Sequence, residues 1–171
     1  MRRKLLPFIV APVLMLGAVP ALLGGFGERA LADHTPSHPI VETVARSEFI
    51  DDVSAQFKLR LAGTKPQNVI RVPNASEVAV VRITFRPGDR IGWHTHPGPA
   101  IAVVEQGELT ITNATDCVAR PYAAGQAFLD PGTPNIHRAD NFGTTDAVVH
   151  VTYLAVPAGM PPTTLLERPS C

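Results

Sequence analysis

Two short segments of this chain carry histidines at spacings that suit metal binding. The first, Gly-Asp-Arg-Ile-Gly-Trp-His-Thr-His, runs from Gly88 to His96 and places two imidazoles at i and i+2. Strand side chains alternate between faces, so His94 and His96 share a face if this segment is a strand. A third imidazole, His137, follows a Pro/Gly-rich turn about forty residues later. Three neutral imidazoles form a suitable ligand set for a divalent transition metal.

The elements that position these histidines are expected to be β-strands. In residues 77–86 the apolar side chains alternate with polar ones, which predicts a strand with one dry face. Turn residues separate such segments at intervals of about eight to twelve residues, as is typical of an all-β sandwich or barrel. No helix is indicated after residue 32, apart from a turn near Arg46 to Asp51. Further strands are predicted at 53–61, 67–72, 100–104, 108–112, 128–129 and 148–156.

Residues 1–32 have the three parts of a signal peptide. A basic start (Arg2-Arg3-Lys4) is followed by an uncharged apolar run and by Ala30-Leu31-Ala32, a small-x-small cleavage site before Asp33. The run is long enough to span a bilayer, so an uncleaved anchor is the alternative. Prolines and glycines interrupt the run and favour cleavage. The prediction is an exported protein, secreted or located in the periplasm or cell envelope, with no stable membrane association after cleavage.

The charge balance excludes a nucleic-acid partner. Of the 15 basic and 15 acidic side chains, four basic and one acidic fall within residues 1–32, which leaves a net charge of −3 on the remainder. This remainder has no basic stripe and no interleaving of aromatic and basic residues. The electrostatic footprint of phosphate-backbone binding is therefore missing.

Composition divides the exported part into three segments. Residues 33–52 are polar at the start, carry prolines and are interpreted as an N-terminal arm, and residues 53–156 are interpreted as the barrel domain. Residues 157–171 contain four prolines and no alternation, which indicates a tail wrapped over the surface. The two cysteines, Cys117 and Cys171, either form a disulfide that ties this tail to the barrel or remain two unpaired thiols.

The two histidine segments resemble the motifs of the cupins, which are small double-stranded β-helix or jelly-roll barrels. The resemblance covers about residues 77–156. Two details depart from the second motif: one extra residue separates its proline from its histidine, and Thr133 stands at the usual glycine. The matching residues are Gly88, His94, His96 and Gly107 in the first motif and Gly125, Pro131, His137 and Asn141 in the second.

A third departure concerns the metal ligands that the resemblance implies. The glutamate of the first motif falls at Ala100, and alanine cannot bind a metal. Glu105 is the nearest carboxylate, but its odd offset from position 100 turns it to the opposite strand face. One interpretation is therefore a three-histidine site for Fe(II), Mn(II), Ni(II) or Zn(II). The other is a barrel without metal, whose histidines line a polar pocket.

Three further residues are candidates near such a site. His150 is in register with Val148 and Thr152, so it is either an inward-facing donor to the metal ligands or an ordinary, partly exposed strand histidine. Trp93 and Tyr153 either form walls of a pocket or belong to the core.

The resemblance leaves several functions open because cupins host unrelated activities. One is a metal-dependent enzyme acting on a small organic molecule, either an oxygenase or an isomerase or lyase. A second is a binding module for a sugar, an acid or the metal itself, without turnover. A structural envelope protein is a third. The family also implies a homodimer formed through edge strands or exchanged terminal strands, for which the 33–52 arm is a candidate.

Overall fold

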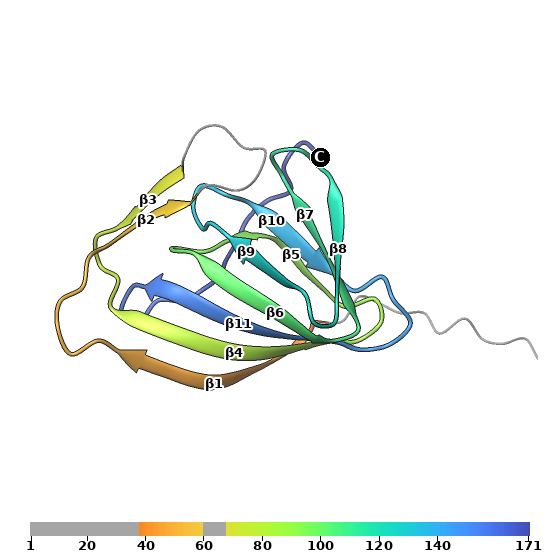
Figure 1. Cartoon of the computed structure of the whole chain (residues 1–171). Coiled ribbons are helices and arrows are strands. Elements are labelled where there is room, and N and C mark those ends of the chain that lie inside the picture. Colours follow the sequence, from red (N-terminus) through yellow and green to blue (C-terminus); the bar gives the residue numbers. More distant parts are fainter. Residues whose placement is uncertain (1–37, 60–67) are drawn as a thin grey trace, which may run out of the picture. The chain divides into compact units, whose positions relative to one another are not determined.

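The computed structural model describes residues 38–59 and 68–171, so the signal peptide predicted for residues 1–32 lies outside the described residues. The described residues form twelve strands and no helix (Figure 1), which confirms the all-β prediction. No helix that could span a membrane occurs in these ranges. The strands are β1 Ile40–Glu48, β2 Ala55–Leu59, β3 Asn68–Val72, β4 Glu77–Phe85, β5 Arg90–Thr95, β6 Ala100–Gln106, β7 Glu108–Asn113, β8 Ala119–Ala123, β9 Ala127–Asp130, β10 His137–Asp140, β11 Ala147–Val156 and β12 Thr164–Leu165.

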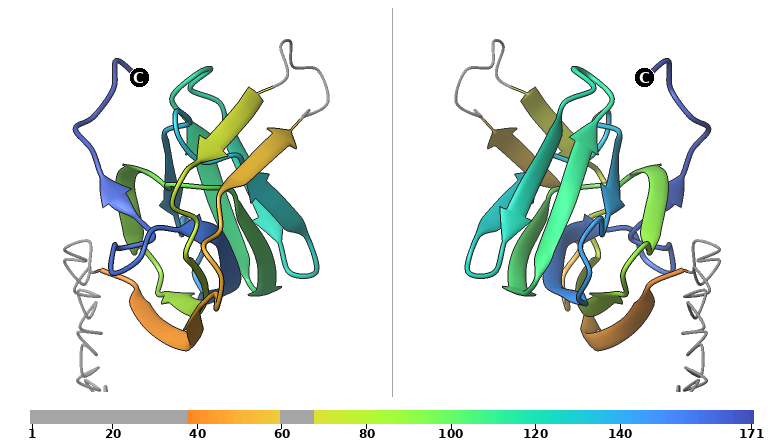
Figure 2. Two further views of the ribbon diagram at one scale, coloured as in Figure 1. Left: turned by 90° about the vertical axis from the view of Figure 1, so that its left-hand side faces the viewer. Right: turned by 90° about the vertical axis from the view of Figure 1, so that its right-hand side faces the viewer.

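Ten of these strands form two five-stranded antiparallel sheets that enclose the core (Figure 2). One sheet has the order β1-β4-β11-β6-β9 and the other the order β12-β5-β10-β7-β8. The remaining two strands, β2 and β3, form a separate hairpin sheet with its own small apolar cluster around Ile70 and Val72. Neighbours within the large sheets are mostly far apart in sequence, so each sheet brings together residues from distant segments.

Strict alternation of side chains explains how the two sheets bury a common core. In β4 every second residue is buried, from Ala79 to Phe85, and the intervening residues are partly exposed. The same period of two recurs in β11, where Val149, Val151 and Tyr153 face inward. Such alternation is what an antiparallel sheet with one wet face requires. The apolar side of each strand therefore decides which side chains line the interior.

In the structure, the sheets also include parts of the predicted arm and tail, which the sequence pattern did not assign to the barrel. Residues 40–48 of the predicted arm form β1, which pairs with β4 along the edge of its sheet. The turn predicted from Arg46 begins later, because Arg46 is still paired with Ala79. In the predicted tail, β12 pairs with β5. All nine residues of β1 are exposed, so the strand has no apolar alternation and depends on backbone pairing with the open edge of β4.

The two cysteines form a disulfide that joins the tail to the loop between β7 and β8. This confirms the first of the two alternatives for Cys117 and Cys171. Their sequence separation is 54 residues, and closing a loop of this size stabilises the folded state by about 4 kcal/mol through the entropy of the unfolded chain.

Asn141, from the second motif, has a structural role at the end of the barrel. It is 1% exposed, and its side-chain amide donates to the carbonyls of Phe85 and Thr145, both at 2.9 Å. Its carbonyl oxygen accepts from the amide of Gly143. We expect Asn141→Ala to leave buried backbone groups unpaired and to lower the free energy of unfolding by about 2–3 kcal/mol. Urea denaturation measures this loss, and Thr144→Ala on the exposed part of the same loop is the control. A loss below about 0.5 kcal/mol would contradict this role.

Candidate metal centre

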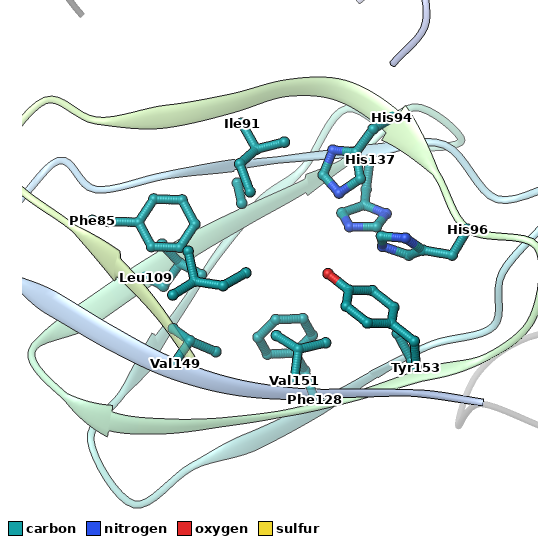
Figure 3. Close-up of a pocket in the computed structure, with 13 residues that line it drawn as sticks. Phe85, Ile91, His94, His96, Leu109, Phe128, His137, Val149, Val151 and Tyr153 are labelled. Atoms are coloured by element: carbon teal, nitrogen blue, oxygen red, sulfur yellow. The ribbon is translucent and has the colours of Figure 1, made fainter. Parts of the chain in front are cut away.

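The fold brings the three predicted histidines together inside the barrel (Figure 3). His94 lies in β5, His96 directly after it, and His137 at the start of β10, where it is the cross-strand partner of His94. One nitrogen from each ring lies within 4.8 Å of the others. Each residue is only 3% exposed. Two segments separated by forty residues therefore converge because β5 and β10 are neighbours in one sheet.

The second nitrogen of each ring has a partner that orients the imidazole. Nδ1 of His94 lies 2.7 Å from the carbonyl oxygen of Gly92, and Nδ1 of His96 lies 2.8 Å from that of Pro162. Nδ1 of His137 lies 2.7 Å from Oδ2 of Asp130. Because these oxygens can only accept, we assign the proton of each neutral ring to Nδ1, which leaves the Nε2 lone pair free. This is the tautomer that a metal ligand needs.

Burial keeps two of these rings neutral. The pKa of His94 falls from 6.5 to about 3, first because burial disfavours the charged form and then because His137 and His96 lie nearby. Burial also lowers the pKa of His96. The rings therefore do not need to lose a proton before they bind a cation.

Asp130 belongs to this site, although the sequence did not single it out as a functional residue. Burial by itself would raise the pKa of its carboxyl, but His137, His96 and Asn135 together lower the pKa below its usual value. Oδ1 accepts from the amide of Gly132 at 2.6 Å, and Oδ2 accepts from the side chain of Asn135 at 2.7 Å. An acidic residue seven positions before a motif histidine was a signal for this role.

We expect Asp130→Asn to weaken metal binding by about 10- to 100-fold, because the carboxylate that orients His137 and raises its basicity is lost. Competition with a chromophoric chelator measures the dissociation constant. Asp116→Asn is the matched control, since Asp116 is an exposed carboxylate paired with Arg120. Equal affinities of the two variants would contradict the role of Asp130.

The rest of the cavity around the histidines is small and apolar. Its free volume is about 30 Å³, enough for one or two water molecules. Tyr153 packs against His96 with ring centroids 4.9 Å apart, and its hydroxyl points toward the histidines (Figure 3). Burial raises the pKa of this phenol, which therefore stays protonated at neutral pH. The other lining residues are Ile83, Phe85, Ile91, Ala100, Leu109, Phe128, Ala139, Val149 and Val151.

The structure also shows where positions 100 and 105 lie, the two positions considered for a carboxylate ligand. Ala100 is 3% exposed and lines the cavity, so a methyl group stands where the glutamate of the motif would be. Glu105 lies on the outer face of the same strand, where it contacts Arg82 and His150. The prediction that Glu105 points to the face opposite position 100 is therefore confirmed.

Of the two alternatives for His150, the structure supports the partly exposed strand histidine and not the inward-facing donor. Its side chain is 43% exposed, and its Nε2 lies 2.7 Å from Oε2 of Glu105 on the outer face of β11 and β6. The inward set of β11 contains Val149 and Val151, not His150. The more apolar of the two alternating sets faces the core, and this difference was the available signal.

A second, larger hollow lies outside the barrel and shares one wall residue with the inner cavity. This outer groove has a volume of about 390 Å³ and is mostly apolar. Ile91 lines both spaces. Trp93, a candidate pocket wall, lines the groove rather than the inner cavity, with the guanidinium of Arg138 5.6 Å from its ring centre. The other groove residues are His38, Pro39, Val41, Arg90, Gly92, Leu165 and Leu166.

Comparisons with known proteins agree with this architecture. An uncharacterized protein with a double-stranded β-helix domain from Klebsiella pneumoniae is 19% identical, with a TM-score of 0.51, over 78% of this chain and 90% of that chain. A cupin domain from Bordetella pertussis is 18% identical, with a TM-score of 0.46, over 71% of this chain and 97% of that chain. No curated protein matches. Residues 81–153 match the cupin domain family. These residues carry both histidine motifs and form a cupin domain with the double-stranded β-helix fold.

Proposed function

We propose that this protein is an exported cupin that binds one divalent transition metal through His94, His96 and His137 and acts on a small organic molecule there. The convergence of three buried imidazoles, with their Nδ1 atoms on acceptors and their Nε2 atoms facing one another, carries this proposal. Imidazole nitrogens suit Fe(II), Mn(II), Ni(II) and Zn(II). Such an ion would supply Lewis acidity or a site for dioxygen.

The charge of the site favours an anionic or chelating ligand. With Ala100 in place of a glutamate, all three ligands are neutral imidazoles. None of them compensates the charge of a divalent ion. The apolar walls exclude water and strengthen electrostatic attraction inside the cavity. A carboxylate, an enolate or a catecholate would satisfy this charge.

The size of the two hollows limits how such a ligand binds. The inner cavity accommodates only its metal-binding group, because its free volume is about 30 Å³. The outer groove falls within the range of small-molecule sites, and its apolar walls suit the body of an organic ligand. Ile91 lines both hollows, so a ligand that reaches from the groove to the inner cavity would pass this side chain.

One observation favours the alternative function, a binding module without turnover. Among the residues that line the inner cavity, the phenol of Tyr153 is the only polar group besides the three histidines. A proton-transfer reaction would have to use this phenol or a group of the ligand itself. A module that holds a sugar, an acid or the metal itself needs no such group.

Elemental analysis of the mature protein, purified anaerobically without chelators, tests the proposed function. We expect about one equivalent of a transition metal per chain. Oxygen uptake and product analysis with diketones, phenols and thiols then separate enzyme from binding module. Ligands that raise the melting temperature of the metal-loaded protein but are not consumed would support the binding module. A protein that takes up none of the four metals contradicts the metal-dependent function and leaves only a module that binds a sugar or an acid without metal.

Export is supported by the signal-peptide pattern and by the disulfide, since disulfides persist mainly in oxidising compartments. Expression in a bacterium followed by N-terminal sequencing tests it. We expect Asp33 as the first residue of the exported protein. Intact Met1 on protein retained in the cytoplasm would contradict export.

We also propose a homodimer formed through β1, whose nine residues are all exposed along a sheet edge. Light scattering coupled to size exclusion measures the mass. A replacement of Val44 by proline at the bulge of β1 is expected to produce monomers. A monomeric parent protein would contradict the proposal.

A further inference from the structure

The C-terminal segment returns to the metal centre after leaving the barrel. Its strand β12 pairs with β5, with Thr164 opposite Thr95 and Leu165 opposite His94. The amide of Leu166 donates to the carbonyl oxygen of Trp93 at 2.8 Å. The segment is therefore docked by its backbone along the strand that carries a metal-binding histidine.

This segment supplies the group that orients His96. The carbonyl oxygen of Pro162 accepts from Nδ1 of His96 at 2.8 Å, and the hydroxyl of Thr163 lies 3.4 Å from the same nitrogen. Thr163 also interacts with the phenol of Tyr153, which packs on His96. The tail thus holds both the ring and its neighbour.

The other two histidines are oriented by the barrel itself. His94 uses the carbonyl of Gly92 in its own strand, and His137 uses Asp130 at the end of β9. His96 lies just beyond the end of β5, outside the ladder that pairs β5 with β10. Its orientation therefore depends on a segment more than sixty residues away, whereas those of His94 and His137 do not.

The far end of the segment is covalently anchored. Cys171 is bonded to Cys117 in the loop between β7 and β8, and Figure 1 shows the C-terminus beside this turn. With β12 paired at one end and the disulfide at the other, the segment cannot drift away from His96. A tether of this kind keeps the effective concentration of the Pro162 carbonyl high.

We infer that residues 162–171 are a positioning element of the metal centre: the Pro162 carbonyl holds the imidazole of His96 for metal binding, and the disulfide keeps that carbonyl in place. This inference rests on the metal site proposed above. It predicts that metal affinity changes when the tail is undocked, although no tail side chain is a ligand. Loss of an orienting partner typically costs about 10- to 100-fold in metal affinity.

The first test undocks the tail while the disulfide stays intact. Leu166→Pro removes the amide that donates to Trp93, and Leu166→Ala is the matched control because it keeps that amide. Co(II) is the probe, titrated with detection of its visible absorption, which reports ligand number and geometry. We expect Leu166→Pro to bind Co(II) at least about 10-fold more weakly with an altered spectrum, and Leu166→Ala to match the parent protein.

The second test releases the other end. We expect the pair Cys117→Ser and Cys171→Ser to weaken Co(II) binding in the same direction. Arg120→Ala, which removes the ion pair to Asp116 in that loop but keeps the disulfide, should have no effect. Nitrogen-15 NMR of the metal-free proteins reads the tautomer of His96 directly. The parent should show the proton on Nδ1, and the undocked variants a mixture of tautomers.

The outcomes distinguish the inference from the proposed function. If the parent binds Co(II) and both undocked variants bind it equally well with an unchanged spectrum and an unchanged His96 tautomer, the inference is overturned and the metal site stands. If the parent binds no Co(II), the proposed function fails, and the inference fails with it. Circular dichroism confirms folding, and if one undocked variant does not fold, the other provides the comparison.

Discussion

Replacing His94 by alanine is expected to abolish metal binding, with a loss of more than about 100-fold in affinity, because a direct ligand is removed. The two remaining imidazoles have no ionised side chain to recruit in its place, since the lining residues other than the histidines are apolar except for the protonated phenol of Tyr153. His137→Ala should have the same effect and should also destabilise the metal-free protein, because the buried Asp130 carboxylate loses the imidazole that it contacts. Elemental analysis and calorimetric titration measure the loss of metal binding in the two variants.

His150→Ala is the matched control for this prediction. It also removes an imidazole from the barrel, but His150 lies on the outer face beside Glu105. We expect its metal content to equal that of the parent protein. A bound metal that persists in His94→Ala and in His137→Ala would show that the ion is held elsewhere.

The second large effect is expected from Ala100→Glu, which restores the carboxylate of the cupin motif. Ala100 is 3% exposed in a cavity with little free space, so the longer side chain overpacks the metal-free barrel and buries a carboxyl group without a partner. We expect a loss of about 3 kcal/mol in the free energy of unfolding without metal. A bound divalent ion should reverse most of this loss, because the carboxylate then becomes a fourth ligand.

Urea denaturation with and without Zn(II) measures this dependence, and Ala100→Gln separates charge from volume. The glutamine variant should be destabilised through overpacking alone, with a smaller recovery when Zn(II) is added. If Zn(II) stabilises Ala100→Glu no more than it stabilises Ala100→Gln, then position 100 does not face the metal.

Local patterns allowed much of this structure to be predicted. The i and i+2 spacing of His94 and His96 determines their common face in a strand. The alternation in β4 and β11 indicated a sheet with one dry face, because side-chain burial in a strand follows a period of two. The odd offset between Ala100 and Glu105 likewise placed the carboxylate outside the barrel. Each of these conclusions needs only the geometry of a single strand.

Strand β1 and the tail could not be predicted in this way. The nine residues of β1 are exposed and have no apolar period, so the strand exists because β4 offers an unpaired edge. The same holds for β12, a two-residue strand in a proline-bearing segment that pairs with β5. Backbone hydrogen bonding is independent of side-chain type, and it leaves no pattern in the sequence of the strand that joins.

The sequence by itself determined which atoms are available for chemistry: three imidazoles, no glutamate at position 100, and two cysteines able to pair. Only the tertiary structure decided how these atoms are held, with Asp130 against His137, Pro162 against His96, and His150 turned to the outer face. The physical reason is that residue type and spacing act along one strand, whereas the orientation of a ring depends on acceptors that distant segments bring to it through sheet pairing and a disulfide.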